Sequence, residues 1–117
     1  MSDPVAEALE AHPELAHLLV LGDPWKWMPP PRDESTGEVL ELHGIRAWPG
    51  SDQVDAIRVR SLTDAMGIRI DADNGELWRR EGGLVEVVDG LRELPPPGHR
   101  LAPRLVKGRT ESGLWIA

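Results

Sequence analysis

Apolar and polar residues alternate in a regular pattern along the middle of the chain, between residues 54 and 94. The runs 57–61 and 66–70 alternate with a period of two, as half-buried β-strands do. Apolar residues then recur at helical spacing from 84 to 94, with charged residues between them. This pattern predicts two strands, a hairpin, a third strand and an amphipathic helix that packs back on the sheet.

The hairpin is indicated by an Asn-Gly pair before the third strand, because both residues accept a positive φ at little cost. A two-residue loop would place Ile70 opposite Arg79. A three-residue loop of residues 73–75, with Gly75 in the left-handed region, places Ile70 opposite Trp78 instead. We favour the second alignment, because it buries two large apolar side chains against each other.

The same alignment collects like charges on the reverse face of the sheet. An even-numbered turn at residues 63–64 pairs Val59 with Ile68, so the large apolar side chains share one face. The other face then carries a row of three arginines, namely Arg58, Arg69 and Arg79. Like charges that face each other across a sheet repel, so acidic groups are expected to neutralise this row.

The segment before the central sheet is predicted to be helical at first and extended later. Asp3 followed by a proline is a typical helix start, and Pro13 predicts a break between two short helices. Residues 24–37 form a proline-rich connector that carries two tryptophans. Residues 38–48 have the pattern of a further strand, with a bulge expected at Gly44.

These elements together predict one α+β domain. It begins with an acidic helical segment at residues 1–23, followed by the connector at 24–37. Residues 38–117 supply a mostly antiparallel sheet of four to six strands, with the 84–94 helix packed on one face. Residues 105–107 and 114–116 are expected to close the sheet as a last hairpin.

Composition narrows the class of protein. The chain has 117 residues, a net charge of −7 and 40% hydrophobic residues, values typical of a single soluble domain. It contains no cysteine, which excludes disulfides and fits a cytoplasmic location. The apolar run at residues 18–21 is far too short to span a membrane, and the acidic start argues against a secretory signal.

The charge is unevenly distributed along the chain. Residues 1–57 hold eleven acidic and three basic side chains, whereas residues 58–117 hold nine and ten. A nucleic-acid-binding protein is normally basic over its contact surface, so the balance argues against nucleic acid as the partner. Open sheet edges in so short a chain leave room for a homodimer, although the net charge disfavours it.

Motifs for catalysis or for metal binding do not stand out. The segment 71–75 resembles the start of an EF-hand loop, but Gly82 occupies the position of the last glutamate ligand. Glu14 and His17 have the spacing of a metal-binding pair on a helix, yet no second pair completes a site. We therefore expect no cofactor, no metal and no catalytic residue.

The arginine row and the connector tryptophans are the candidate binding residues. They are Arg58, Arg69, Arg79, Trp25 and Trp27. The arginines are either neutralised internally, by the acidic helices or by Asp55, Asp71 and Glu81, or they bind an anionic partner. The tryptophans either fold back on the core or form a recognition loop.

The favoured hypothesis is a small non-catalytic interaction or regulatory protein that binds an acidic protein partner. The alternative is a ligand-binding or enzymatic domain with a pocket between helix and sheet, near Trp78 and His99. A third hypothesis is nucleic-acid binding through the arginine row.

Overall fold

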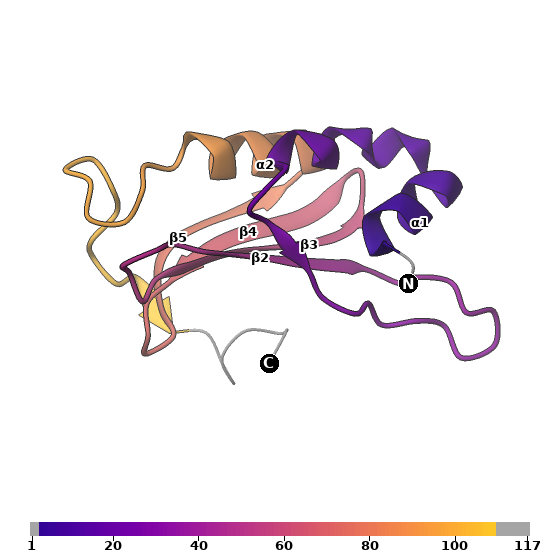
Figure 1. Cartoon of the computed structure of the whole chain (residues 1–117), viewed down its shortest axis with the longest axis horizontal. Coiled ribbons are helices and arrows are strands. Elements are labelled where there is room, and N and C mark those ends of the chain that lie inside the picture. Colours follow the sequence, from indigo (N-terminus) through magenta and orange to yellow (C-terminus); the bar gives the residue numbers. More distant parts are fainter. Residues whose placement is uncertain (1–2, 110–117) are drawn as a thin grey trace.

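The order of helices and strands in the computed structural model, which describes residues 3–109, agrees with the predicted α+β layout (Figure 1). The elements are α1 (Pro4–Ala11), the 3₁₀ helix η1 (Pro13–Leu21), β1 (Lys26–Trp27), β2 (Leu42–Ala47), β3 (Val54–Ser61), β4 (Asp64–Ile70), β5 (Gly75–Gly82), α2 (Leu84–Glu93) and β6 (Gly108–Arg109). The strands form one antiparallel sheet in the order β1-β2-β3-β4-β5-β6. The predicted fold class is confirmed.

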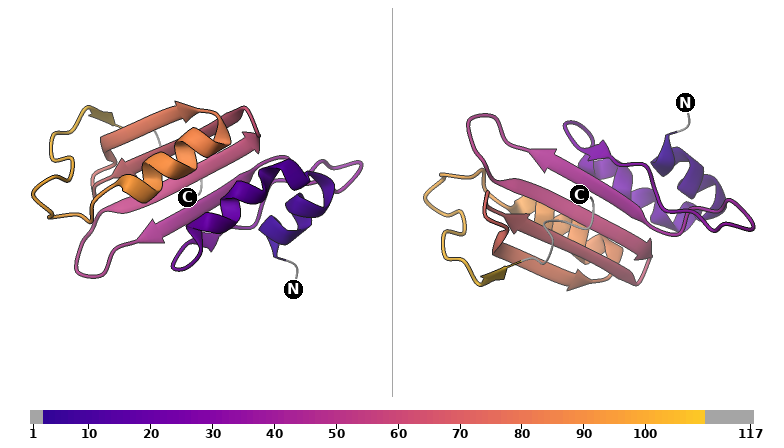
Figure 2. Two further views of the ribbon diagram at one scale, coloured as in Figure 1. Left: turned by 90° about the horizontal axis from the view of Figure 1, so that it is seen from above. Right: turned by 90° about the horizontal axis from the view of Figure 1, so that it is seen from below.

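The helices of residues 3–109 lie over one face of the sheet, with η1 and α2 next to each other (Figures 1 and 2). The apolar stripe of α2 meets the sheet through Leu84, Val87 and Leu91, which are almost fully buried. The core between the two layers also contains Leu15 and Leu18 of η1. The packing of the 84–94 helix on the sheet, predicted from its periodicity, is therefore confirmed.

The amino-terminal helices begin and end where the sequence predicts. The Asp3 carboxylate accepts a hydrogen bond from the Val5 backbone N–H at 2.9 Å, which satisfies one of the free donors at the start of α1. The chain breaks at His12, and Pro13 begins η1. Gly22 has a φ of 55° and ends η1.

The predicted alignment of β3 with β4 is wrong. The turn between the two strands has two residues, and Ser61 pairs with Asp64 across it. A β-bulge between Val59 and Ser61 then shifts the pairing of the earlier residues of β3 with β4. Val59 then lies opposite Ala65, rather than opposite Ile68. The shift is odd-numbered, so it turns the apolar side chains of β4 to the other face of the sheet.

The predicted hairpin loop has the correct length of three residues, but it was placed at residues 73–75 and lies at residues 72–74. The Asp71 N–H donates to the Gly75 carbonyl, and Asn74, not Gly75, has the positive φ of 61°. The Asp71 carboxylate accepts bonds from two backbone N–H groups of the loop, which fixes this position. A bulge after Glu76 then places Trp78 opposite Arg69.

These registers give the sheet two apolar faces rather than one. Ile57 and Val59 face the helices, whereas Ala56, Ile68 and Ile70 form a smaller buried cluster on the reverse face. On the helix side, the Trp78 ring lies against two glycines. A Cβ atom at Gly67 would lie 3.1 Å from this ring, and a Cβ atom at Gly90 would lie 3.0 Å from it. The glycine inside α2 therefore allows the helix to approach β5 closely.

Two further expectations differ from the structure. Gly44 pairs regularly with Ile57 and forms no bulge; its lack of a side chain makes room for the Trp27 ring instead. Residues 105–107 lie in the loop before β6 rather than in a strand of their own. The other half of the predicted closing hairpin, residues 114–116, lies outside the described residues.

Candidate functional site

The three arginines predicted to form a binding row are not brought together. Arg69 is 0% exposed and points toward the helix side of the sheet. Arg58 and Arg79 lie on the reverse face, since they pair with Met66 and Ile68 of β4. The prediction that the three arginines form a continuous surface is therefore wrong, because it depended on strand registers that differ from those in the structure.

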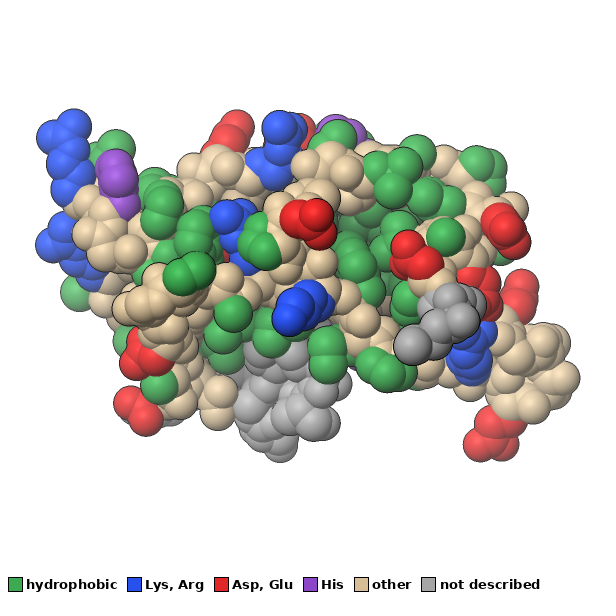
Figure 3. All heavy atoms as spheres, in the orientation of Figure 1, with side chains coloured by type: hydrophobic (Ala, Val, Ile, Leu, Met, Phe, Trp, Pro, Cys, Tyr) green, Lys and Arg blue, Asp and Glu red, His purple; other side chains and the backbone are tan. Residues whose placement is uncertain are grey.

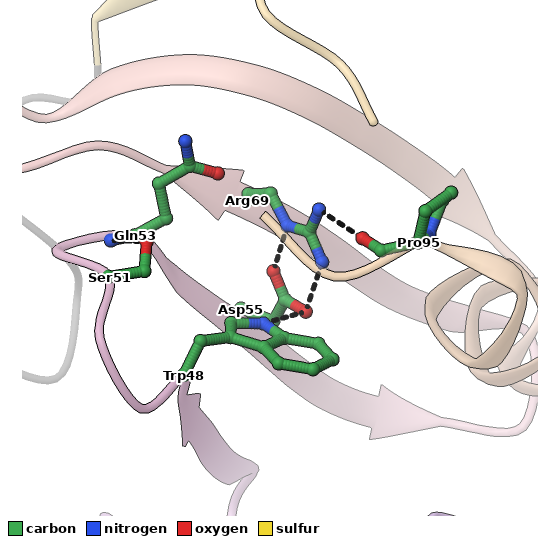
Figure 4. Close-up of polar contacts among 6 residues, drawn as sticks. All are labelled: Trp48, Ser51, Gln53, Asp55, Arg69 and Pro95. Atoms are coloured by element: carbon green, nitrogen blue, oxygen red, sulfur yellow. Dashed lines mark hydrogen bonds and ion pairs between the residues drawn. The ribbon is translucent and has the colours of Figure 1, made fainter. Parts of the chain in front are cut away.

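Arg69 takes part in a buried polar cluster with Asp55 (Figure 4). Its guanidinium donates to the two Asp55 carboxylate oxygens at 2.6 and 3.0 Å, and to the Pro95 carbonyl at 2.6 Å. The Trp48 indole N–H donates to the same carboxylate at 3.0 Å. The Arg46 guanidinium lies 3.7 Å from the Trp48 ring centroid, as in a cation–π contact.

The loop between β2 and β3 positions Trp48 for this contact. The Ser51 N–H donates to the Trp48 carbonyl at 3.1 Å, and the Gln53 N–H donates to the Ser51 hydroxyl at 3.1 Å. Burial lowers the pKa of Arg46 from its usual value, and the Asp55 carboxylate partly offsets this effect.

The polar cluster has a structural role. Asp55 comes from β3, Arg69 from β4 and Pro95 from the segment after α2, so the cluster joins the end of the helix to the centre of the sheet. The bonds to Arg69 use both carboxylate oxygens and all three guanidinium nitrogens. Asp55 thus neutralises Arg69 within the molecule, as the internal alternative required.

The other charged side chains of the predicted row also have internal partners. The Arg79 guanidinium lies 3.2 Å from the Glu81 carboxylate and 2.8 Å from the Glu76 carboxylate. Its hydrogen bonds to these two carboxylates raise the pKa of Arg79. Arg58 lies 3.9 Å from Glu41, whose carboxylate also bonds the His43 ring at 2.7 Å. Asp71 stabilises the hairpin loop instead of an arginine.

Glu14 and His17 do not converge on a common point. His17 bonds Asp89 of α2 at 2.8 Å, whereas Glu14 lies 3.4 Å from His12. Within residues 3–109, no three His, Asp or Glu side chains are placed to hold a metal ion. The same part of the chain contains no helix long and apolar enough to cross a membrane.

The two connector tryptophans have different surroundings. Trp25 is 6% exposed and belongs to the core, so it folds back on the sheet. Trp27 is half-buried on β1, and its ring lies against Gly44 of β2, where a Cβ atom would be 2.8 Å from the ring. The missing side chain at Gly44 therefore positions the Trp27 ring.

Trp25 and Trp27 line an open groove of about 310 Å³, which we call the tryptophan groove. Its other lining residues are Asp3, Val5, Leu18, Leu19, Gly22 and Asp23. Leu19 is 63% exposed, and Val20 beside it is 43% exposed. The apolar surface and its acidic border are visible over α1 and η1 in the right half of Figure 3.

The tryptophan groove could be only partly found from the sequence. The sequence shows that residues 3–23 contain five acidic side chains and no basic one, and it shows the two tryptophans of the connector. The exposure of Leu19 was not predicted, because Leu18 and Leu19 both fit the apolar stripe of an α-helix. In the tighter 3₁₀ geometry of η1, Leu18 is buried and Leu19 faces outward.

Comparison of the chain with protein-family models, with curated protein sequences and with solved structures gave no match. The geometry of the tryptophan groove is therefore the main basis for a functional proposal.

Proposed function

We propose that this chain is a small non-catalytic protein-interaction domain that binds a partner protein through the tryptophan groove. The observation that carries the proposal is the exposure of Leu19, at 63%, in a groove that Trp27 also lines. Leaving a leucine in water forgoes roughly 1.5–3 kcal/mol of burial free energy. Apolar patches with a polar border are typical of protein-binding surfaces.

The Trp27 ring is well suited to act as an anchor. Tryptophan is enriched among the residues that dominate binding energy at interfaces. Packing against Gly44 restricts the ring before any partner arrives, and a restricted side chain loses less entropy on binding. The proposal therefore keeps the tryptophan-bearing connector as the binding element and omits the arginine row.

The border of the groove indicates the chemistry of the partner. Asp3 and Asp23 line the groove, and residues 3–23 carry no basic side chain. A partner that presents an apolar side chain next to lysine or arginine matches this surface. Such a partner is basic, in contrast to the acidic partner expected from the arginine row.

Site-specific crosslinking tests the proposal. A photo-crosslinking amino acid at position 19 is expected to capture a discrete partner in cells that produce the chain. The same group at Leu62, which is also exposed but lies in the turn after β3, serves as the matched control. The substitution Trp27→Ala should weaken the crosslink at position 19. Equal products from positions 19 and 62 would contradict the proposal.

A further inference from the structure

A second surface of this chain has the properties that the groove requires of its partner. The loop between α2 and β6, residues 96–107, which we call the basic loop, contains Arg100, Arg104 and Lys107 and no acidic residue. Leu101 and Leu105 of this loop are 69% and 82% exposed. The loop thus combines exposed leucines with basic side chains.

The basic loop and the tryptophan groove are separated along the molecule. The fold is elongated, with extents of 44 × 27 × 26 Å. In Figure 3 the basic side chains gather at the left end, beyond α2, whereas the apolar surface with acidic neighbours lies in the right half. The two surfaces therefore lie toward opposite ends of one molecule, and a contact between them requires two molecules.

The basic loop is held in shape by hydrogen bonds within it and by one to β5. Ala102 is buried and its N–H donates to the His99 carbonyl at 2.9 Å. The His99 N–H donates to the Pro96 carbonyl at 3.1 Å, and the Lys107 N–H donates to the Glu76 carbonyl at 2.7 Å. A loop that is ordered before binding loses less conformational entropy in the complex.

Exposed apolar side chains are concentrated on the basic loop and on η1, the helix that contributes Leu18 and Leu19 to the groove. The described residues include eight large apolar side chains that are strongly exposed, and five of them lie on η1 or on the basic loop. These five are Leu19, Val20, Leu101, Leu105 and Val106. Both surfaces are therefore apolar, and their charges are of opposite sign.

We infer that the tryptophan groove of one molecule binds the basic loop of a second copy. This inference rests on the proposed function, for which it names the partner. The contact joins two different surfaces, so it leaves a free groove at one end of a pair and a free loop at the other. Association then continues beyond two copies, unless a ring closes.

Sedimentation of the full chain over a range of concentrations tests this inference. Wild type is expected to form dimers and larger species as concentration rises from micromolar to millimolar, since a contact of one loop is small and weak. Leu19→Asp removes the groove contact and Leu105→Asp removes the loop contact, so each variant alone should remain monomeric. Leu62→Asp is the matched control and should associate like wild type.

Mixing the two defective variants is the decisive experiment. Leu19→Asp retains an intact basic loop and Leu105→Asp retains an intact groove, so the mixture should form a 1:1 dimer that does not grow further. Raising the ionic strength should weaken this dimer, because it screens the charges around the contact. A mixture that remains monomeric would overturn the inference, as would a wild type that is monomeric at every concentration.

The outcome also separates this inference from the proposed function. If wild type stays monomeric while position 19 still crosslinks to a different protein, the inference fails and the proposed function stands. If Leu19→Asp does not change self-association and Trp27→Ala does not weaken the crosslink at position 19, both fail.

Discussion

The block from β3 to α2 and the acidic segment at residues 3–23 use their charged side chains in opposite ways. In the block, Arg69 and Asp55 are 0% exposed and bind each other, and Arg79 bonds two neighbouring glutamates. In the acidic segment, Asp23 is exposed at the edge of an apolar groove, next to Leu19. A charge that is paired inside the fold must keep its partner for the fold to stay stable, whereas a charge that remains at the surface is available to a partner protein.

This difference predicts two classes of mutational effect. Changes in the buried polar cluster should lower the free energy of unfolding, because they leave a charge without a partner in the core. Changes at the exposed leucine of the groove should alter binding and leave stability within about 0.5 kcal/mol.

The largest effect is expected from Asp55→Ala. The substitution leaves the Arg69 guanidinium buried without its carboxylate, and the loss of one partner from a buried ion pair costs about 3–5 kcal/mol. Urea denaturation should show this loss as a lower midpoint. Removing both charges, with Asp55→Ala and Arg69→Met together, should restore much of the stability, because no unpaired charge remains.

The exposed pair of the same sheet is the control. Glu81→Ala removes one partner of Arg79, whose side chain is 44% exposed. Exposed ion pairs contribute about 0–1 kcal/mol, so this variant should unfold close to wild type. Equal losses from Asp55→Ala and Glu81→Ala would mean that burial does not distinguish the two pairs.

The contrast between these two arginines also shows what the sequence could predict. The amino-terminal helices, the strands β2 to β5 and the helix α2 were predicted in the correct order, since they depend on local periodicity, caps and prolines. The burial of Arg69 was not predictable, because it depends on registers set by one bulge after Val59 and another after Glu76. Nothing in the alternation of apolar residues marks these bulges, and a shift by an odd number of residues exchanges the two faces.

The candidate site likewise combines residues that stand out in the sequence with a contact that depends on strand pairing. The sequence singled out the connector tryptophans as candidate binding residues. The alternative in which they fold back on the core holds for Trp25, and the recognition-loop alternative stays a prediction. Trp25 belongs to the core, and Trp27 lies at the edge of the groove. Sequence alone did not link Trp27 to Gly44, because the two residues pair across strands that are separated by a long connector.

The second largest effect is expected from Gly44→Ala. The added Cβ atom would lie 2.8 Å from the Trp27 ring, which is rigid and must therefore move. Forcing an extra group into a close contact costs about 1–3 kcal/mol. Thermal unfolding should show the loss, and the tryptophan fluorescence spectrum should shift as the ring changes its environment.

Gly108→Ala is the matched control for this prediction. The nearest atom to a Cβ at Gly108 is the Glu76 carboxylate at 3.3 Å, at the end of a flexible side chain. This variant should be close to wild type in both measurements. If Gly44→Ala leaves the fluorescence unchanged, the ring is not held by the contact with β2.

A smaller effect is expected in the hairpin loop. Asn74→Ala puts a residue with no local hydrogen-bonding side chain at a φ of 61°, which costs about 1 kcal/mol. Asn74→Gly should be near neutral, because glycine adopts this conformation readily. Urea denaturation of the two variants distinguishes them, and equal losses would show that the left-handed φ is not the cause.

The smallest effect concerns the ion pair that ties the acidic segment to the connector. Arg32 donates to the two Glu7 carboxylate oxygens at 2.6 and 2.9 Å, and this hydrogen bonding lowers the pKa of Glu7 below 4.5. A carboxyl group with a lowered pKa in the folded state stabilises the fold above its ordinary pKa, and this contribution is lost as pH falls through the lowered value.

Wild type and Glu7→Gln should therefore differ slightly in stability at neutral pH and converge as pH falls below 4.5. Thermal unfolding from pH 7 to pH 3 measures the difference, and raising the salt concentration should reduce it. Glu10→Gln, at an exposed position of the same helix, controls for the change in net charge. A difference that stays constant across this range would assign the effect of Glu7 to packing rather than to its charge. The Glu7 charge would then contribute little to stability.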